Sequence, residues 1–299
     1  MKFHWRSSMR IVLVHGINQE GKSADIIRDE WMGALRRTCS KEGLADPTID
    51  ISRIDAAFYG DTLLALSAGW VAGQTIALGA EEASDDFDEF SVKALEEMAL
   101  RMGATREDIE SEAATTTVAL GAGIHKKWVK AIARVIERIS PFGGTLAMRF
   151  LGQAHAYLRN QHVNSEINRL VEPLFEDDEP MVVIAHSLGT VLCYSLLRKF
   201  AERNRPRQVP LLITLGSPLG IDSVRKSFSK PRNRPAGVVR WFNGADPEDF
   251  IALQASLTPT TFGSGIENYP DFENGHDDPH SVAAYLSDKR VVLAIAETV

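Results

Sequence analysis

The sequence has 299 residues, of which 44% are hydrophobic and 24% are charged, and its formal net charge is −7. This composition is typical of a globular protein that buries a sizeable core in one large or two smaller domains. Because proteins that bind nucleic acids usually carry a basic field, the acidic balance argues against DNA or RNA as a partner.

The cysteines and the N-terminus indicate the compartment. Cys39 and Cys193 stand alone, without a C-x-x-C neighbour, which favours reduced thiols over a disulfide framework. The first ten residues, MKFHWRSSMR, lack the apolar stretch of a secretory signal. We therefore expect a cytoplasmic protein.

The first predicted elements are a strand, a helix and a second strand. The apolar run 11–14 is typical of a strand buried on both faces of a parallel sheet. Ser23 is a suitable N-cap for an amphipathic helix that extends to about Thr38. The partly alternating stretch 48–60 predicts the next strand.

From about Asp61 to Asn160 the pattern predicts successive helices without an evident strand. Within it, residues 62–80 carry no charge and are long enough to span a bilayer. They are rich in Gly, Ala, Ser and Thr and include Gln74, and this composition disfavours insertion into a membrane. A buried hairpin, or a mobile lid that contacts lipid transiently, is the favoured interpretation.

After residue 160 helices and strands alternate again. Helices are predicted at 163–175, at 188–200 and in the C-terminal tail, and strands at 181–187, 209–218 and 238–243. Strands that alternate with helices predict a mostly parallel central sheet flanked by helices. The expected organisation is an α/β core formed by residues 1–60 and 160–299, interrupted by a helical insertion at 61–159.

The segment Gly16–Ser23 has two interpretations. It satisfies G-x-x-x-x-G-K-[ST], the phosphate-binding P-loop, between a predicted strand and a predicted helix. However, Glu20 would lie inside the phosphate cradle, and no apolar strand ends in an Asp suited to Mg²⁺. A loop and helix cap is the favoured interpretation, and nucleotide binding is kept as an alternative.

A second junction predicts a nucleophile. Ala185-x-Ser187-x-Gly189 lies where an apolar strand meets a helix, and its small flanking residues allow the strand and the helix to approach. The helix begins at Leu188, so its N-terminal N–H groups and dipole face any negative charge that forms near Ser187.

Downstream of Ser187 the sequence offers two candidate acids and two candidate bases. Asp246 and Asp249 follow an apolar strand, and His276 and His280 are the histidines that come after them. The order Ser, acid, His is the order that a hydrolase of α/β type requires. His280 is favoured as the base because it begins the last predicted helix, and His276 is the alternate.

Five stretches together resemble a bacterial α/β-hydrolase of the lipase/esterase kind: VLVHGIN, AHSLGT, TLGSPLG, NGADPEDFIA and HSVAAYL. The resemblance implies an α/β-hydrolase fold in which the insertion 61–159 is a cap or lid. It also implies that Asp249 is the triad acid, with Asp246 as alternate. The backbone N–H groups of Ile17 and Leu188 would form the oxyanion hole.

These features predict a serine hydrolase that cleaves a small-molecule or lipid ester through a Ser187–His280–Asp249 triad, without metal or cofactor. His15, Asn18 and His186 are possible substrate-loop residues. The alternative from a different class is a binding protein that keeps this fold without turnover.

Overall fold

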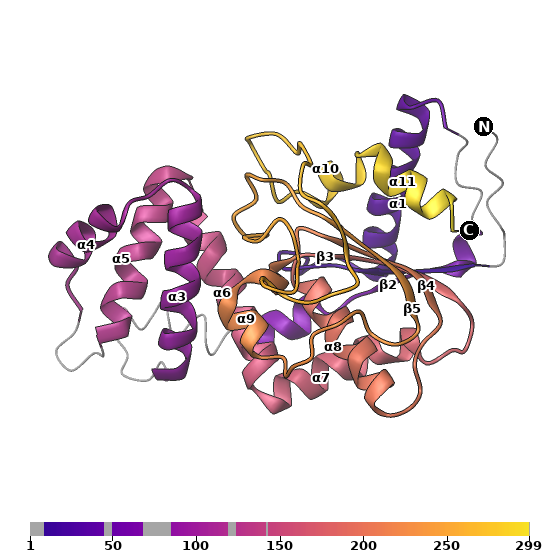
Figure 1. Cartoon of the computed structure of the whole chain (residues 1–299), viewed down its shortest axis with the longest axis horizontal. Coiled ribbons are helices and arrows are strands. Elements are labelled where there is room, and N and C mark those ends of the chain that lie inside the picture. Colours follow the sequence, from indigo (N-terminus) through magenta and orange to yellow (C-terminus); the bar gives the residue numbers. More distant parts are fainter. Residues whose placement is uncertain (1–8, 45–49, 68–84, 119–123, 142, 299) are drawn as a thin grey trace. The chain divides into compact units, whose positions relative to one another are not determined.

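The structure is a computed structural model that describes residues 9–44, 50–67, 85–118, 124–141 and 143–298 (Figure 1). The chain divides into two compact units. Unit 1 comprises Met1–Gly60, Asn168–Gly220 and Ser229–Val299, and unit 2 comprises Asp61–Ile167 and Ile221–Phe228. The short segment Ile221–Phe228, which the sequence analysis placed within the α/β core, is thus grouped with the helices of unit 2.

Unit 1 contains a parallel sheet, which in the described part of the chain has six strands in the order β2-β1-β3-β4-β5-β6. Every neighbouring pair is parallel. The strands are β1 (Arg10–Val14), β2 (Ile54–Ala57), β3 (Met181–His186), β4 (Val209–Leu215), β5 (Val238–Gly244) and β6 (Glu267–Tyr269). The expected α/β class, with a parallel sheet flanked by helices, is confirmed.

The apolar runs of the sequence correspond to the central strands. All six residues of β3 are buried, because helices cover both faces of a parallel sheet at its centre. The two edge strands differ from the expectation. β2 is shorter than the predicted strand 48–60 and follows a 3₁₀ turn at Ile51–Arg53. β6 was not predicted, since its three residues are too few to form an apolar or alternating pattern.

The sheet reverses its strand order between β1 and β3. The chain leaves β1 through α1 (Ala24–Lys41) toward β2, and it leaves β3 through α8 (Leu188–Glu202) toward β4 on the other side. Since such crossovers are right-handed, the two helices cover opposite faces of the sheet. Figure 1 shows α1 on the same side of the sheet as the C-terminal helices α10 (Val282–Leu286) and α11 (Lys289–Ala296), with α8 on the other side.

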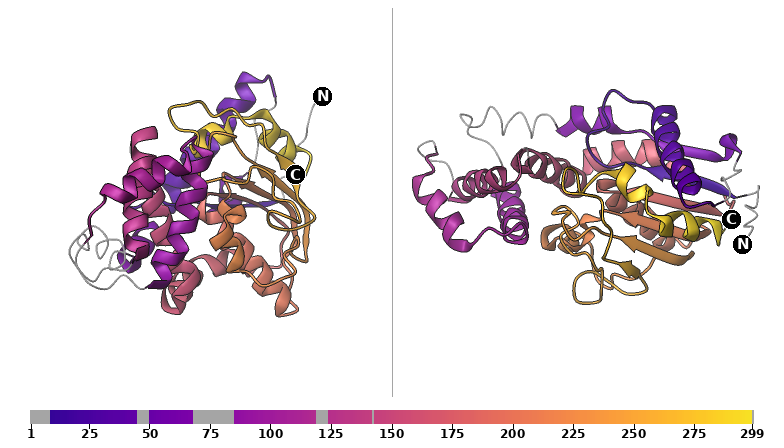
Figure 2. Two further views of the ribbon diagram at one scale, coloured as in Figure 1. Left: turned by 60° about the vertical axis from the view of Figure 1, so that its left-hand side comes forward. Right: turned by 90° about the horizontal axis from the view of Figure 1, so that it is seen from above.

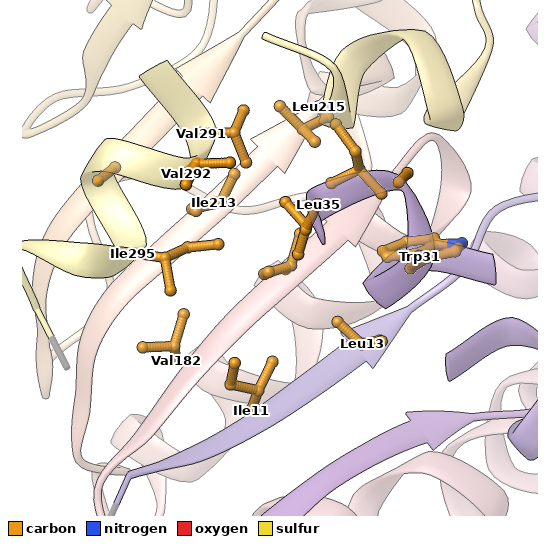
Figure 3. Packing of buried hydrophobic residues seen from close by; sticks show 14 of the residues in the cluster. Ile11, Leu13, Trp31, Leu35, Val182, Ile213, Leu215, Val291, Val292 and Ile295 are labelled. Atoms are coloured by element: carbon orange, nitrogen blue, oxygen red, sulfur yellow. The ribbon is translucent and has the colours of Figure 1, made fainter. Parts of the chain in front are cut away.

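One face of the sheet forms the apolar core seen in Figure 3. Alternate residues of the central strands contact α1 and α11 there: Ile11, Leu13, Val182, Ile213 and Leu215 from the sheet, with Trp31, Leu35, Val291, Val292 and Ile295 from the helices. Burying one such side chain contributes about 1.5–3 kcal/mol. This layer therefore stabilises the packing of α1 and α11 on the sheet.

The described part of unit 2 consists of helices joined by short turns and loops and contains no strand, as predicted for that part of the chain (Figure 2). After residues 60–67, which are helical, come α3 (Asp85–Arg101), α4 (Arg106–Thr115), α5 (Ile124–Ile139) and α6 (Gly143–Arg159). α7 (Gln161–Val171) and a 3₁₀ turn at Glu172–Phe175 lead back to β3, and α9 (Asp222–Lys226) joins unit 2 from the later chain. Lys93 of α3, with Arg225 and Lys226, binds the carboxylate of Asp222.

The proposed lid or lipid-contacting segment 62–80 lies, from residue 68 onward, outside the described residues. Within the ranges that the structure describes, no helix is both long enough and apolar enough to cross a bilayer. Cys39 and Cys193 are buried thiols on α1 and α8.

Gly189 provides a test of how closely α8 approaches β1. A Cβ atom at this position would lie 2.3 Å from the carbonyl oxygen of Val14. We expect Gly189→Ala to lower the free energy of unfolding by about 1–3 kcal/mol, because backbone rather than a flexible side chain must move. Denaturant unfolding measures this change.

Gly33→Ala in α1 is the matched control. Its added Cβ would meet only the guanidinium end of Arg37, at 3.3 Å. Because alanine favours the helix, we expect unchanged stability or a gain of about 0.5–1 kcal/mol. Equal effects of the two substitutions would contradict the close approach of α8 and β1.

Candidate active site

Ser187 occupies a strained turn between β3 and α8. Its φ of 54° and ψ of −130° are a combination that residues other than glycine rarely adopt. The turn is nevertheless held on both sides, because the Ser187 N–H donates to Leu215 O at 3.0 Å and the Thr190 N–H donates to Ser187 O at 2.9 Å. Ser187 therefore lies in the sharp turn between the strand and the helix, as the pattern Ala185-x-Ser187-x-Gly189 predicts.

Two glycines allow the chain to close around this turn. A Cβ on Gly16, in the loop after β1, would lie 2.5 Å from Ser187 Cβ, and a Cβ on Gly189 would overlap the carbonyl groups at the end of β1. The glycines at 16 and 189 thus have a steric explanation. The strand order reverses between β1 and β3, and parallel sheets commonly bind ligands at the carboxyl ends of the strands at such a point.

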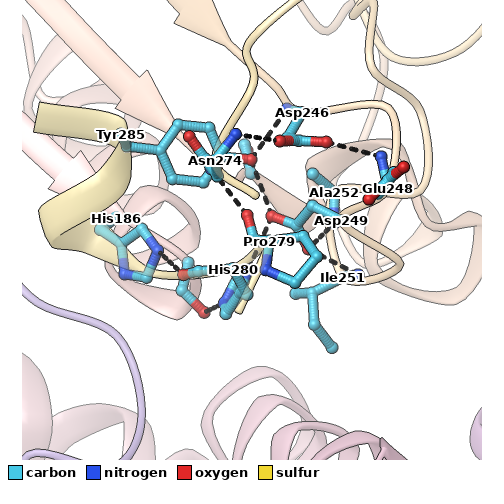
Figure 4. Close-up of polar contacts among 12 residues, drawn as sticks. His186, Asp246, Glu248, Asp249, Ile251, Ala252, Asn274, Pro279, His280 and Tyr285 are labelled. Atoms are coloured by element: carbon cyan, nitrogen blue, oxygen red, sulfur yellow. Dashed lines mark hydrogen bonds and ion pairs between the residues drawn. The ribbon is translucent and has the colours of Figure 1, made fainter. Parts of the chain in front are cut away.

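The serine, a histidine and an aspartate form a chain of hydrogen bonds. Ser187 Oγ lies 2.8 Å from His280 Nε2, and His280 Nδ1 lies 2.7 Å from Asp249 Oδ2. An ionised carboxylate can only accept, so the imidazole carries its proton on Nδ1 and accepts the serine hydroxyl at Nε2. The structure brings together the three residues that the sequence analysis selected. Figure 4 shows His280 beside Asp249.

Asp249 is buried and fully engaged in hydrogen bonds. Its Oδ1 accepts the N–H groups of Ile251 and Ala252, at 2.9 and 3.2 Å, and its Oδ2 also accepts the hydroxyl of Tyr285 at 2.8 Å. Burial alone would raise the pKa of Asp249, but His280 and these donors together hold that pKa below its usual value. The group is therefore a carboxylate at neutral pH.

His186 holds the main chain of His280. It directly precedes Ser187, and its Nε2–H donates to the carbonyl oxygen of His280 at 2.9 Å. Burial, with the nearby His280, lowers the pKa of His186 to about 3, so the ring is neutral. His186 was expected as a possible substrate-loop residue, and the structure places it buried, with its ring centroid 4.7 Å from that of His280.

The loop after β1 is anchored by His15. Its Nδ1–H donates to Gly16 O at 2.6 Å, and its Nε2 accepts the Tyr59 N–H at 3.3 Å. Burial lowers the pKa of His15 to about 4. His15 is therefore a buried anchor, whereas Asn18, the other expected loop residue, is exposed at a φ of 62°.

The two expected oxyanion-hole residues, Ile17 and Leu188, each adjoin a residue of the Ser187 turn. Leu188 is the first residue of α8, where backbone N–H groups have no intrahelical acceptor. Ile17 follows Gly16, which packs directly against the Ser187 side chain. The oxyanion hole formed by these two N–H groups stays a prediction.

The alternates for acid and base lie outside this hydrogen-bonded chain. Asp246 accepts the N–H groups of Glu248 and Asn274, at 2.7 and 2.6 Å. His276 is exposed, and its Nδ1 lies 2.5 Å from a carboxylate oxygen of Glu248. Their contacts stabilise loops and do not reach Ser187.

The P-loop interpretation of Gly16–Ser23 finds little support in the local contacts. The hydroxyl oxygen of Ser23 accepts the Ile26 N–H at 3.2 Å, which confirms Ser23 as the N-cap of α1. The ammonium group of Lys22 pairs with Glu30 at 2.6 Å. These contacts are those of a loop and helix cap.

Sequence reasoning missed two residues that shape the site, Tyr285 and Gly216. Gly216 follows β4 at a φ of 57°, and a Cβ there would lie 2.9 Å from Asp249 Oδ2 and 3.2 Å from His280 Cε1. A glycine directly after an apolar strand was a usable signal for such a close approach. Tyr285 gave no such signal, because a tyrosine in a short apolar helix is usually a core residue.

Comparisons with known proteins gave no match to a family model, to a curated protein or to a solved structure. Among the described residues, no cluster of three or more His, Cys, Asp or Glu side chains has an arrangement that could hold a metal ion.

The buried neutral histidines predict loss of stability in acid. The pKa of His15 is 6.5 in the unfolded reference and about 4 in the fold, so its contribution is complete above pH 6.5 and declines as the pH falls toward 4. Between those two pH values, protonation of His15 lowers the free energy of unfolding by up to about 1.4 kcal/mol for each pH unit of acidification. In His15→Asn we expect a shallower decline, measured by denaturant unfolding at successive pH values.

His276→Asn is the control, because it removes an exposed imidazole from the same unit. We expect it to retain the steep wild-type dependence. A wild-type slope in His15→Asn would show that the burial of that ring is not what weakens the fold in acid.

Proposed function

We propose that this protein is a serine hydrolase that cleaves carboxylic esters through an acyl-enzyme intermediate. The observation that carries the proposal is the pair of hydrogen bonds that joins Ser187 to His280 and His280 to Asp249, at 2.8 and 2.7 Å. The strained backbone of Ser187 is a second support, since such strain concentrates at catalytic turns. In this proposal unit 1 is an α/β-hydrolase core.

In the acylation step, Ser187 Oγ attacks the carbonyl carbon of the ester while His280 Nε2 takes the hydroxyl proton. Asp249 keeps the imidazole in the tautomer that can accept this proton and stabilises the imidazolium that results. The oxyanion is stabilised by the N–H groups of Ile17 and Leu188. As the tetrahedral intermediate collapses, His280 returns the proton to the leaving alcohol.

In the deacylation step, a water molecule takes the place of the alcohol. His280 removes its proton as the water oxygen attacks the acyl carbon, and Ser187 leaves with the proton that His280 returns. Each proton transfer and each stabilising contact comes from this chain, so the proposed mechanism requires no metal or cofactor. The products are a carboxylic acid and an alcohol.

We propose a small-molecule or lipid ester as the substrate. Unit 2 is inserted in the chain between β2 and β3, and we assign it the role of a cap or lid. The buried thiols of Cys39 and Cys193 favour a reducing, cytoplasmic setting for this activity. The remaining alternative, a binding protein of the same fold without turnover, is separated from the enzyme by the next experiment.

Removing the nucleophile tests the proposal directly. We expect Ser187→Ala to reduce kcat on a p-nitrophenyl ester by about 10³-fold or more, because no acyl-enzyme can form. A fluorophosphonate probe should label the wild type at Ser187 and leave the variant unlabelled, as read by peptide mass spectrometry.

Ser195→Ala is the matched control, since it removes a half-buried serine from the same helix. It should retain both activity and labelling. A wild type that resists the probe and all esters of a panel graded by acyl length would favour the non-catalytic alternative.

The acid is tested by comparing two neighbouring aspartates. We expect Asp249→Asn to lower kcat by about 10⁴-fold, because an amide can hold His280 in the wrong tautomer. Asp246→Asn should weaken the fold through its contacts with Glu248 and Asn274 but leave kcat nearly unchanged. Steady-state kinetics of both variants measure these effects. If Asp246 were the acid, Asp246→Asn would show the large loss of kcat and Asp249→Asn would not.

A further inference from the structure

Tyr285 lies next to the candidate triad without belonging to it. It is on α10, five residues after His280, and it is fully buried. Its ring packs beside Phe272 and His186, with centroids 5.5 and 5.9 Å away. In Figure 4 its hydroxyl end points toward the loop that carries Asp246 and Asp249.

The direction of the two hydrogen bonds made by the Tyr285 hydroxyl is determined by its partners. The oxygen lies 3.0 Å from the backbone nitrogen of Asp246 and 2.8 Å from Asp249 Oδ2. A backbone N–H can only donate, so the phenol accepts from Asp246. Its single proton is therefore directed to Asp249.

The oxygen that receives this proton is the one that faces His280. Asp249 Oδ2 accepts both the Tyr285 hydroxyl and His280 Nδ1–H, whereas Oδ1 accepts two backbone N–H groups of its own loop. Tyr285 thus shares the negative charge that would otherwise act on His280 alone. It also prevents the carboxylate from turning away from the imidazole.

We propose that Tyr285 is a positioning residue of the triad: its hydroxyl fixes Asp249 Oδ2 opposite His280 and moderates the pull of the carboxylate on the imidazole. This inference rests on the proposed function, because it assigns Tyr285 a role in the same site. Tyr285 touches neither substrate nor reacting atoms and acts through Asp249.

The surroundings keep the phenol protonated. Burial, and then the charge of Asp249, raise the pKa of Tyr285 above its usual value. The titratable groups that face Tyr285 and His280 are Asp246 and Asp249 from the loop after β5 and His186 from the end of β3. Since burial keeps His186 neutral, the charged group in contact with His280 is the carboxylate of Asp249.

Tyr285→Phe removes the hydroxyl and keeps the ring. Without that donor, more charge remains on the carboxylate oxygen that faces His280, which favours the protonated imidazole. We expect the midpoint of His280, followed by NMR of its ring without substrate, to rise by about half a pH unit or more. In the pH profile of kcat/KM, the fall on the acid side should move to higher pH by a similar amount. We expect a lower kcat and a nearly unchanged KM.

Tyr194→Phe is the control, since it removes a buried phenol from α8, where the ring packs on Trp241 and Phe262. It should leave the His280 midpoint unchanged. If Tyr285→Phe does not fold, 3-fluorotyrosine placed at position 285 gives the test without a cavity. The more acidic hydroxyl of 3-fluorotyrosine donates more strongly to Asp249 and leaves less charge facing His280. The midpoint of His280 should therefore fall.

A lower kcat in Tyr285→Phe with an unmoved or lowered His280 midpoint would overturn the inference and leave Tyr285 a merely structural residue. The NMR titration needs no turnover. It therefore decides the role of Tyr285 even if Ser187→Ala shows that the protein does not hydrolyse esters through Ser187.

Discussion

The site depends on the close approach of two chain segments that follow neighbouring strands. Gly16 after β1 and Gly189 in α8 bring their backbones against Ser187 and the end of β1, where no side chain fits. A residue held at the φ of Ser187 costs about 1–3 kcal/mol, which the surrounding structure must supply. Here the buried strand β3 and the hydrogen bonds of Ser187 with Leu215 and Thr190 supply it. The sheet thus orients a serine that a flexible loop could not hold.

A second constraint is the burial of a charge. A carboxylate removed from water must be matched by donors, or it takes up a proton instead. Asp249 meets this condition with two backbone N–H groups, a phenol and an imidazole. The Asp246 carboxylate accepts the Asn274 N–H and so joins the loop that carries Asp249 to the segment that leads to His280. The two aspartates therefore have different contacts: Asp246 holds the loops together, and Asp249 accepts a hydrogen bond from His280.

The central strands and the three residues of the hydrogen-bonded chain were predictable because their signals are local. Apolar runs mark β1, β3 and β4, and a mostly apolar stretch that Arg240 interrupts marks β5. Chain order together with position at an element boundary singles out Ser187 and His280. Choosing Asp249 over Asp246 needed the family resemblance. β6 and α9 were missed because three and five residues are too short for a periodic pattern. Tyr285 and the grouping of Ile221–Phe228 with unit 2 depend on contacts between distant residues, such as Asp222 with Lys93, which no local pattern contains.

The environments of three neighbouring histidines decide which of them can carry a proton. The fold keeps His15 and His186 neutral by burial, and protonation of His15 at Nε2 would also lose the bond from the Tyr59 N–H. Of the three, His280 has a carboxylate on one ring nitrogen and the serine hydroxyl on the other. A charged His186, with its ring 4.7 Å away, would oppose a positive charge on His280. In the proposed mechanism a neutral His186 is therefore a condition for His280 to act as the base, and the burial of His15 and His186 leaves His280 as the one of the three that would take the serine proton.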